Sequence, residues 1–513
     1  MMQQLPRSPF RPPPVSLPLS PPLPLLGDLP PDEMRAALHR MADWVADYRE
    51  SLEARLIVPA GQPGDVRRGL GAHMPRDAEP LDAILTDLDQ VVMPGIVHWG
   101  HPAFLGYFGS TSNGPALLGE IAAAALNVSA MTWRTSPAAT ELETTVLQWI
   151  RELIGLPAAF TGIVYDTASV AVLHALAAAR EEALLEVRRL GLAGRPELSA
   201  LRLYASDQAH SSLEKAAIVL GIGEGNVVRV ASDDRQRLDV EALRSAIAED
   251  RARGLVPLAV VATVGTTTSA SVDPVPAVAE LCAQEGLWLH VDAAYGGAIG
   301  ALPEGRALLA GVERADSVVV NPHKWLFVPL DFSTLYVRRP AALRRVFSLV
   351  PEYLRGDASS GAPGAEGAID YMDYGIQLGR RFRALKAWMV LRAFGRSGIE
   401  ARIREHCRLA GLVAARVEAT PGFVLAAPVS MSVVCFRFAP SGVDAAGMDA
   451  LNTAAVAAVN AGGGGYLTHS MLDGRTVMRM GFGNVLTTEA HLDRVWSLVV
   501  AACQRLGGDR GTG

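Results

Sequence analysis

Long apolar runs and an excess of one charge are both missing from this sequence of 513 residues. No run of about 18 apolar residues is free of helix breakers, so a membrane span is not predicted. The 47 basic and 53 acidic residues give a formal charge of −6 and form no long run of either sign. Nothing in this balance indicates nucleic acid or an anionic membrane as a partner.

Cysteine is also scarce. The four cysteines lie far apart, and none has the CxxC spacing of a redox or metal motif. We therefore expect buried, reduced thiols in a cytoplasmic protein, with no disulfide framework and no metal site. The four residues are Cys282, Cys407, Cys435 and Cys503.

Proline is concentrated at the N-terminus, where it accounts for ten of the first 30 residues. Leu17–Gly27 looks apolar, but its four prolines prevent the helical core of a signal peptide, and no convincing cleavage site follows. Residues 1–30 are therefore predicted to form a disordered, polyproline-like tail.

The rest of the composition, 50% hydrophobic and 19% charged, is typical of a globular protein. The chain is too long for one compact core, so one large domain and smaller ones are expected. Apolar residues recur at helical spacing over Met34–Leu56 and Leu81–Val92. Because helices this short with little other core are unstable alone, residues 31–111 are predicted to need a packing partner.

Strands and helices alternate from about Ser112 onward. Short runs rich in β-branched residues, separated by helical segments, are typical of a mainly parallel sheet covered by helices on both faces. We predict this α/β domain over residues 112–385 and a small α+β domain over residues 386–508. The expected strands of the large domain are Gly162–Tyr165, Leu201–Ala205, Val227–Val230, Pro257–Val264, Leu287–Val291, Ser317–Val320 and Thr334–Arg338.

The segments between these strands are mostly helical. Helices are predicted over Val170–Leu190, Val240–Arg253 and Pro274–Glu285, whereas Tyr353–Met372 is rich in small residues and predicts a long mobile loop. In the small domain we expect strands at Ser430–Phe438 and Thr476–Phe482, and a final helix from Glu489.

The strongest chemical signal is a lysine directly after a buried strand. Ser317–Val320 runs into Asn321-Pro-His-Lys-Trp325. Lysines normally lie on solvated faces, because burying an unpaired ammonium is costly. A partly desolvated Lys324 has a lowered pKa and a nucleophilic amine, which is what Schiff-base chemistry needs.

A carboxylate follows another strand about thirty residues upstream, at Asp292 in Leu287-Trp-Leu-His-Val-Asp-Ala-Ala-Tyr-Gly-Gly297. Ligands of parallel sheets bind outside the carboxyl ends of the strands, where Lys324 and Asp292 both fall. A lysine that bonds an aldehyde and an aspartate that pairs with a pyridinium nitrogen are the groups that pyridoxal phosphate most needs. Each motif alone is equally consistent with a structural ion pair, and together they predict this cofactor.

A phosphate site is predicted at the start of the helix that follows Gly162–Tyr165. Free N–H groups and a partial positive charge make a helix N-terminus suitable for phosphate. Ser169 is a candidate ligand there, and the alternative is that it only caps the helix.

Four motifs together resemble the signatures of the group II pyridoxal-phosphate decarboxylases, and most closely those of the aromatic-L-amino-acid decarboxylases. The resemblance covers roughly Asp32 to Leu506 and implies the fold of the fold-type I pyridoxal-phosphate enzymes and a homodimer joined through the N-terminal segment. The motifs are Asn321-Pro-His-Lys-Trp325, His290-Val-Asp-Ala-Ala-Tyr295, Ser206-Asp-Gln-Ala-His-Ser-Ser212 and Gly379-Arg-Arg-Phe-Arg383.

The resemblance assigns roles around the cofactor. Ala168 and Ser169 match the phosphate ligands of the family, and Asn321 matches a further phosphate contact. Thr267 is expected to hydrogen-bond near the cofactor. His210 matches the histidine that stacks on the pyridine ring and approaches the substrate carboxylate; a lone histidine is otherwise more often structural.

Two further residues are assigned by resemblance to proton chemistry. His323, beside Lys324, is expected either to assist proton transfer or to brace the phosphate site. Tyr353 matches the loop acid that protonates Cα after carbon dioxide leaves, and related plant aldehyde synthases carry phenylalanine there. With His210 retained, the tyrosine favours simple decarboxylation.

The substrate pocket is predicted from an aromatic wall, with ordinary core packing as the alternative for these aromatics. Ser129-Ala-Met131 stands where the family has an apolar isoleucine-x-phenylalanine wall, and Gly109 replaces a proline, so we expect a roomier and more adaptable pocket. Gly379 matches a glycine of many indole-accepting members. The predicted substrate residues are Trp99, Tyr107, Phe108, Ser110, Met131 and Gly379.

The predicted activity is decarboxylation of an aromatic L-amino acid to its amine, with catalytic residues Lys324, Asp292, His210 and Tyr353. An aldehyde synthase would share all the cofactor residues, so this activity remains an alternative. A decarboxylase for a non-aromatic, acidic amino acid would need a basic pocket. A non-catalytic protein would be expected to lose the lysine or the loop tyrosine.

Overall fold

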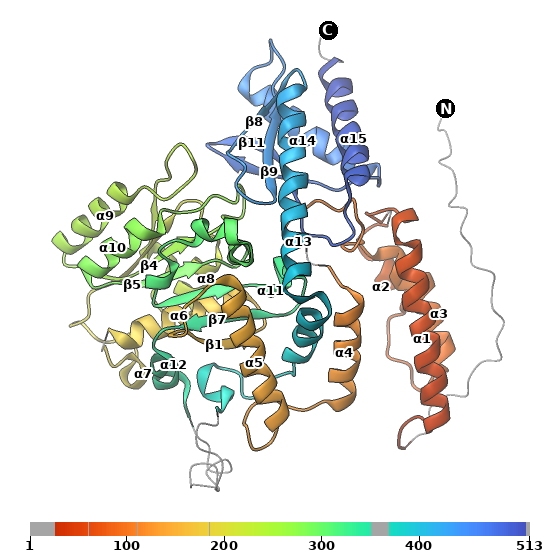
Figure 1. The fold of residues 1–513 in the computed structure, drawn as a ribbon, viewed down its shortest axis with the longest axis horizontal. Helices are drawn as coiled ribbons and strands as arrows, with labels where there is room; N and C mark the ends of the chain where they lie inside the picture. The colour runs from red at the N-terminus through yellow and green to blue at the C-terminus, as the bar shows by residue number, and fades with distance from the viewer. Residues whose placement is uncertain (1–25, 60, 110, 184, 350–368, 509–513) are drawn as a thin grey trace. The chain divides into compact units, whose positions relative to one another are not determined.

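The computed structural model describes residues 26–508 apart from 60, 110, 184 and 350–368 (Figure 1). Most of the predicted proline-rich tail and of the predicted loop lies outside the described residues. The chain divides into two compact units, Met1–His98 and Trp99–Gly513. The domain limits expected at residues 111 and 385 stay predictions. Among the described helices, none is long and apolar enough to cross a membrane.

The first unit is helical, as its sequence predicts. Helix α1 (Pro31–Ser51) begins with proline at its first position and with Asp32 and Glu33 in its first turn, which suits the positive end of the helix dipole. Helices α2 (Asp65–Gly69) and α3 (Leu81–Asp87) follow, and a π-helical turn over Leu88–Val92 completes the predicted second pattern. No residue of α1 is buried.

The second unit is built on a seven-stranded sheet in the order β1-β7-β6-β5-β4-β2-β3. Strands β6, β5, β4, β2 and β3 are parallel, whereas β7 is antiparallel to both of its neighbours. All seven predicted strands are confirmed to within one residue at each end. They are β1 (Thr161–Tyr165), β2 (Leu201–Ser206), β3 (Val227–Val230), β4 (Val256–Thr263), β5 (Trp288–Asp292), β6 (Ser317–Val320) and β7 (Ser333–Val337).

Helices cover this sheet. Helix α6 contacts β4, β5, β6 and β7, while α9 and α10 also contact β4. The helices of this region are α4 (Gly114–Leu126), α5 (Pro137–Ile154), α6 (Ala168–Glu182), α7 (Val187–Leu190), α8 (Ser212–Val219), α9 (Val240–Ala252), α10 (Val275–Glu285), α11 (Pro322–Trp325) and α12 (Pro340–Phe347).

One predicted helix is wrong. The single helix expected over Val170–Leu190 is two helices, α6 and α7, and Glu186 between them has a positive φ of 51°. Tertiary contacts override the helical propensity here. The Arg188 guanidinium of α7 donates to the backbone oxygens of Arg345 and Ser348, at the end of α12.

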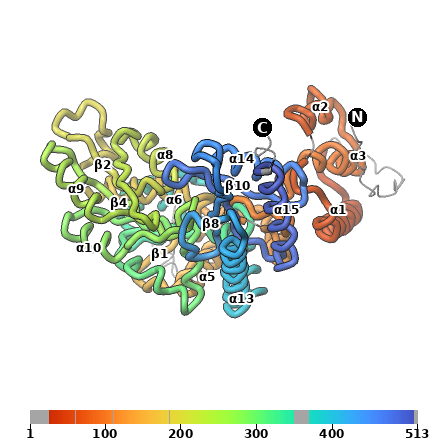
Figure 2. The backbone as a smooth tube through the Cα atoms, turned by 90° about the horizontal axis from the view of Figure 1, so that it is seen from above, coloured from red at the N-terminus to blue at the C-terminus, as the bar shows by residue number. Residues whose placement is uncertain are grey.

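A small antiparallel sheet, in the order β10-β11-β9-β8, forms the C-terminal part. The two predicted strands are confirmed as β9 (Val433–Phe438) and β11 (Arg475–Gly481), whereas β8 (Phe423–Leu425) and β10 (Thr468–Leu472) were not predicted. Helices α14 (Ala445–Ala461) and α15 (Glu489–Gly508) pack on each other. Helix α13 (Ala384–Ala419), bent at Gly395, packs on α4 and α5 and contacts β8 and β9 of the small sheet, and Figure 2 shows the same parts from above.

Candidate active site

A cavity of about 160 Å³ lies at the carboxyl ends of the strands of the large sheet. It is lined by residues that directly follow β1, β4, β5 and β6, as the fold of a parallel sheet predicts. Seven of the predicted cofactor residues meet there: Ala168, Ser169, His210, Thr267, Asp292, Asn321 and Lys324.

Lys324 lies on α11, the short helix that follows β6, and its backbone N–H donates to the carbonyl of Asn321 at 2.9 Å. Its Nζ is 4.8 Å from the centre of the Phe108 ring. Burial lowers the pKa of Lys324, the nearby Asp292 carboxylate opposes this shift, and the Arg479 guanidinium adds to it. A larger neutral fraction of the amine is therefore available for bonding than in an exposed lysine.

Asp292 ends β5, the central strand of the sheet, and is 8% exposed. One carboxylate oxygen accepts from the backbone N–H of Ala294 at 3.0 Å. Thr263 stands beside it in register on β4, and among the described residues its buried Oγ1 has no hydrogen-bond partner. An acceptor and an unsatisfied hydroxyl thus face the same cavity.

The backbone around Thr263 is held by a second buried carboxylate, that of Asp273. It accepts from the N–H of Thr263 at 2.7 Å and from that of Leu238 at 2.8 Å. Burial raises the pKa of Asp273 to about 6. Asp273 thereby fixes the end of β4 next to Asp292.

Helix α6 begins at Ala168, with Thr167 as the residue before its first turn. Ser169 is therefore inside the helix, and the interpretation of Ser169 as an N-cap is wrong. The first N–H groups of a helix have no partner within it, and Ala168 and Ser169 line the cavity, so the start of α6 is suited to bind an anion there. Asn321, which directly follows β6, lines the same cavity, is 3% exposed and accepts from Ser333 Oγ at 2.6 Å.

The two predicted histidines differ in position. His210 lines the cavity, where desolvation lowers its ring pKa, with Asp292 opposing and Lys324 adding to the effect. His323 does not line the cavity: it is buried, and its Nδ1 accepts from the N–H of Phe332 at 3.1 Å. Burial first, and then Lys324, lowers the pKa of His323 to about 3.

An aromatic stack backs the cavity. The rings of Phe108 and Tyr295 lie 4.1 Å apart between their centres, and those of Tyr295 and Trp325 lie 4.9 Å apart. The Tyr295 hydroxyl is 2.7 Å from Ser432 Oγ, which ties this stack to the small-sheet region. Phe108 is thus held beside Lys324.

None of the predicted substrate residues that the structure describes is among the residues lining this cavity, and Phe108 lies behind it through its contact with Tyr295. Trp99 and Tyr107 stack on each other with their ring centres 5.3 Å apart and are 41% and 48% exposed. The backbone oxygen of Met131 accepts from the N–H of Met372 at 3.0 Å, and Gly379 is exposed. Ser110, like Tyr353, lies outside the described residues.

Gly109 packs closely against another part of the backbone, because a Cβ added there would lie 3.3 Å from the backbone nitrogen of Asn484. The expectation that this glycine widens the pocket stays a prediction.

Four site residues were missed from the sequence: Thr263, Asp273, Tyr295 and Arg479. Tyr295 is the last residue of the motif His290-Val-Asp-Ala-Ala-Tyr295 that contains Asp292, so the sequence did point to it. Thr263 is the last residue of β4 and the second-last of the predicted strand, and ligands of parallel sheets bind at the carboxyl ends of strands. Arg479 lies in the small sheet, and only the fold brings it here.

Comparison with known proteins agrees with this arrangement. The model of the pyridoxal-dependent decarboxylase conserved domain matches residues 63–439. The chain belongs to this family. The cofactor of the family is pyridoxal 5'-phosphate (PLP), and the substrate is an amino acid.

Similar proteins align with nearly the whole decarboxylase chain. Tryptophan decarboxylase 2 of Oryza sativa subsp. japonica is 39% identical over 476 residues, covering 91% of this chain and 94% of that protein. Phenylacetaldehyde synthase of a Rosa hybrid cultivar is 37% identical and covers 92% and 94%. The crystal structure of Oryza sativa TDC with PLP and tryptamine superposes with a TM-score of 0.89 at 35% identity, over 94% of this chain and 99% of that one. The fold is therefore that of the fold-type I PLP decarboxylases.

The residues present fit PLP. The amine of Lys324 suits the aldehyde, the carboxylate of Asp292 suits the pyridine nitrogen, and the start of α6 with Asn321 suits the phosphate. The unpartnered Oγ1 of Thr263 offers a further polar contact on the same wall.

Proposed function

We propose that this decarboxylase acts on an aromatic L-amino acid and releases the amine and carbon dioxide. The observation that carries the proposal is the ring of Phe108 beside the reactive lysine, with 4.8 Å between Nζ of Lys324 and the ring centre. Aromatic rings favour stacked or edge-on contacts with other rings. The names of the similar tryptophan and tyrosine decarboxylases support the same substrate class.

Three residues that line the cavity and one residue of the predicted loop have a part in this proposal. Bound PLP supplies a sink for the electrons left at Cα when the carboxylate departs. Lys324 would bond the aldehyde of the cofactor, Asp292 would keep its pyridine nitrogen protonated, and His210, which also lines the cavity, would lie against its ring. The proton that completes the amine is proposed to come from Tyr353, which lies outside the described residues.

The test is an amine-release screen with tryptophan, tyrosine, phenylalanine, 3,4-dihydroxyphenylalanine and 5-hydroxytryptophan, and with glutamate as control. Carbon dioxide and amine are measured together by radiometric trapping and chromatography. At least one aromatic amino acid is expected to exceed glutamate in kcat/KM by more than about 100-fold, since a charged side chain against Phe108 would lose its hydration. Preference for glutamate would overturn the proposal.

A second candidate function is oxygen-dependent aldehyde formation, and the similarity to phenylacetaldehyde synthases favours it. In that reaction an amino acid, oxygen and water give the aldehyde, carbon dioxide, ammonia and hydrogen peroxide. Oxygen uptake and peroxide during the screen separate the two, because simple decarboxylation consumes no oxygen. We place this candidate second because Tyr353 retains a hydroxyl that can donate a proton.

Tyr353→Phe is expected to shift the product from amine to aldehyde and peroxide, because phenylalanine cannot return the proton to Cα. Loss of carbon dioxide should continue, so the ratio of amine to carbon dioxide should fall by about tenfold or more. Tyr371→Phe is the matched control, since the Tyr371 hydroxyl contacts Thr144 Oγ1 at 2.9 Å away from the cavity. An unchanged product ratio would assign the proton to another group, such as His210.

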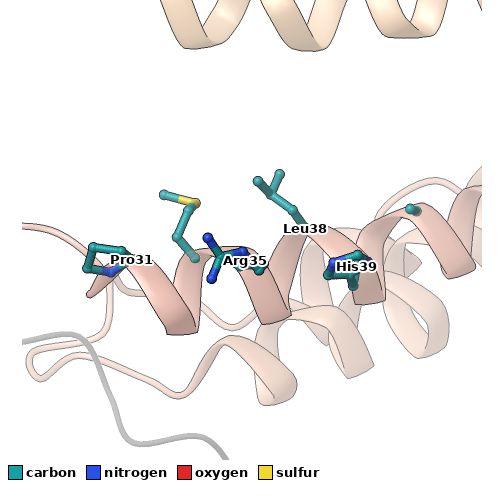
Figure 3. Close-up of a pocket in the computed structure, with 6 residues that line it drawn as sticks. Pro31, Arg35, Leu38 and His39 are labelled. Carbon is teal, nitrogen blue, oxygen red and sulfur yellow. The ribbon is translucent and has the colours of Figure 1, made fainter.

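The active protein is further proposed to be a cytoplasmic homodimer. Four unpaired cysteines among the described residues are consistent with a reducing compartment. Helix α1 buries none of its own residues, and a shallow groove runs along it (Figure 3). The groove is lined by Pro31, Met34, Arg35, Leu38, His39 and Ala42.

Leu38→Asp is expected to weaken self-association, because Leu38 is an apolar groove residue that is 52% exposed in one chain. Leu190→Asp is the control, because Leu190 on α7 has a similar exposure of 47% and lies outside the groove. Sedimentation of the parent should give a dimer. A fully active monomeric parent would contradict this part of the proposal.

A further inference from the structure

A buried asparagine, Asn113, joins two parts of the chain that lie 214 residues apart in the sequence. Its Oδ1 accepts from the backbone N–H of Ala116 at 3.1 Å, which caps α4, and its Nδ2 donates to the backbone oxygen of Phe327 at 2.6 Å. Asn113 is 3% exposed. Because a backbone N–H only donates and a carbonyl oxygen only accepts, these partners fix which way the amide points.

The bond to Phe327 goes beyond what a helix cap needs. An N-cap requires only a side-chain acceptor, so serine, threonine and aspartate serve as well as asparagine. Asparagine adds an amide donor, and here the donor meets the backbone oxygen of a residue that is 1% exposed. A buried backbone oxygen needs a partner, so the amide of Asn113 has a task besides capping α4.

Phe327 lies in the turn that directly follows α11, the short helix of the reactive lysine. Its φ of 63° is in the left-handed region, which a bulky residue rarely adopts and which persists only where the surroundings hold it. The N–H groups of Leu326 and Val328 both donate to the carbonyl of Pro322, at 3.1 and 3.2 Å, so the turn folds back onto the start of α11. The bond from Asn113 therefore helps to hold α11 in place.

The segment that ends in Asn113 carries the aromatic wall of the site. Phe108 lies five residues before Asn113, and its ring centre is 4.8 Å from Nζ of Lys324. The same ring stacks on Tyr295. One amide thus ties the segment that bears the ring to the turn that follows the amine.

We propose that Asn113 is a positioning residue, which ties these two segments together and so holds the amine of Lys324 where it bonds PLP. Asn113 is not among the residues that line the cavity, so it acts through Phe327. The inference is independent of the substrate class and rests on the assignment of Lys324 as the lysine that bonds PLP. Loss of the amide should displace the amine and leave α4 capped.

Asn113→Ser is the test, because serine retains a helix cap and removes the amide that reaches Phe327. Two properties are measured: the rate of PLP attachment to apoprotein, and the visible circular dichroism of the cofactor per PLP attached. The dichroism reports how the protein orients the attached cofactor. The rate is expected to fall by about three- to tenfold, as for one lost hydrogen bond that positions a reacting group, and the dichroism should fall with it.

Asn452→Ser is the matched control. Asn452 is also buried, and its amide likewise donates to a backbone oxygen, that of Phe438, at 2.9 Å and accepts from the N–H of Phe438 at 2.8 Å. It does not line the cavity. Asn452→Ser should lower the midpoint of thermal unfolding and leave the attachment rate and the dichroism unchanged.

A lower thermal midpoint in Asn113→Ser, with the attachment rate and the dichroism of the parent, would show that Asn113 only supports the fold and would overturn the inference. If Asn113→Ser does not fold, Asn113→Thr, which also keeps a cap, takes its place, and parental values there overturn the inference equally.

Failure of the proposed function gives a different result. Reduced cofactor on a lysine other than Lys324 in the parent would remove the assignment on which the role of Asn113 rests, and would overturn the inference. A parent that attaches PLP to Lys324 but does not act on aromatic amino acids would contradict only the proposed function.

Discussion

Lys324→Ala is expected to abolish the covalent attachment of PLP and to lower turnover by about 10³-fold or more. Lys324 is the lysine that lines the cavity, at the end of β6 and beside Asp292. No other described residue of the cavity carries an amine. Borohydride reduction of the holoenzyme, followed by peptide mapping, should find the reduced cofactor on Lys324 of the parent and nowhere on the variant.

The sequence makes this measurement unusually clean, because it contains only three lysines, Lys215, Lys324 and Lys386. Lys215→Ala removes an exposed lysine and should change nothing. Lys386→Met removes a buried lysine that pairs with Glu120 at 2.5 Å, so stability should fall while the attachment site is retained. Reduced cofactor on either of these lysines in the parent would contradict the assignment.

The pH dependence of attachment follows from the environment of the same amine. Burial and Arg479 hold the pKa of Lys324 below its ordinary value, so its neutral form appears at a lower pH than in an exposed lysine. The rate of attachment to apoprotein should therefore rise with pH and level off below the usual range for lysine. Loss of the Arg479 charge should move this rise to higher pH.

Much of the large sheet was predictable because its strands are short and rich in β-branched residues, and most of their residues are buried. Val227–Val230 and Ser317–Val320 match the prediction to the residue. The missed strand β10 is half exposed and, among the described strands, pairs only with β11, and its sequence lacks a continuous apolar run. The break between α6 and α7 was missed because contacts with α12, and no local breaker, end the helix.

The residues of the candidate site were also predictable only in part. Lys324 and Asp292 were predictable because each directly follows a strand, and parallel strands bring their carboxyl ends to one edge. Thr267 and Ser169 fall at the ends of recognisable elements. Arg479 was not predictable, because it sits within a strand of the other sheet, and its contact with Phe108 depends on how the two sheet regions pack.

Asp292→Asn is expected to retain PLP but to lose more than about 100-fold in kcat. The carboxylate keeps a proton on the pyridine nitrogen, and that proton lets the ring accept electrons when carbon dioxide leaves. Breaking a buried charge pair costs about 3–5 kcal/mol, and each 1.4 kcal/mol in the barrier is about tenfold in rate. Because asparagine has nearly the same shape, the hydrogen bond from Ala294 should survive.

The control is Asp316→Asn, at the opposite end of the sheet. Asp316 accepts from the N–H of Leu289 at 2.9 Å and pairs with Arg339 at 2.9 Å, away from the cavity. Asp316→Asn should lower the midpoint of thermal unfolding and leave kcat within a few-fold of the parent. PLP affinity, measured by dialysis, separates lost cofactor from lost chemistry in Asp292→Asn. If the loaded variant turned over within a few-fold of the parent, the pyridine nitrogen would not need its charged partner, and the role given to Asp292 would be wrong.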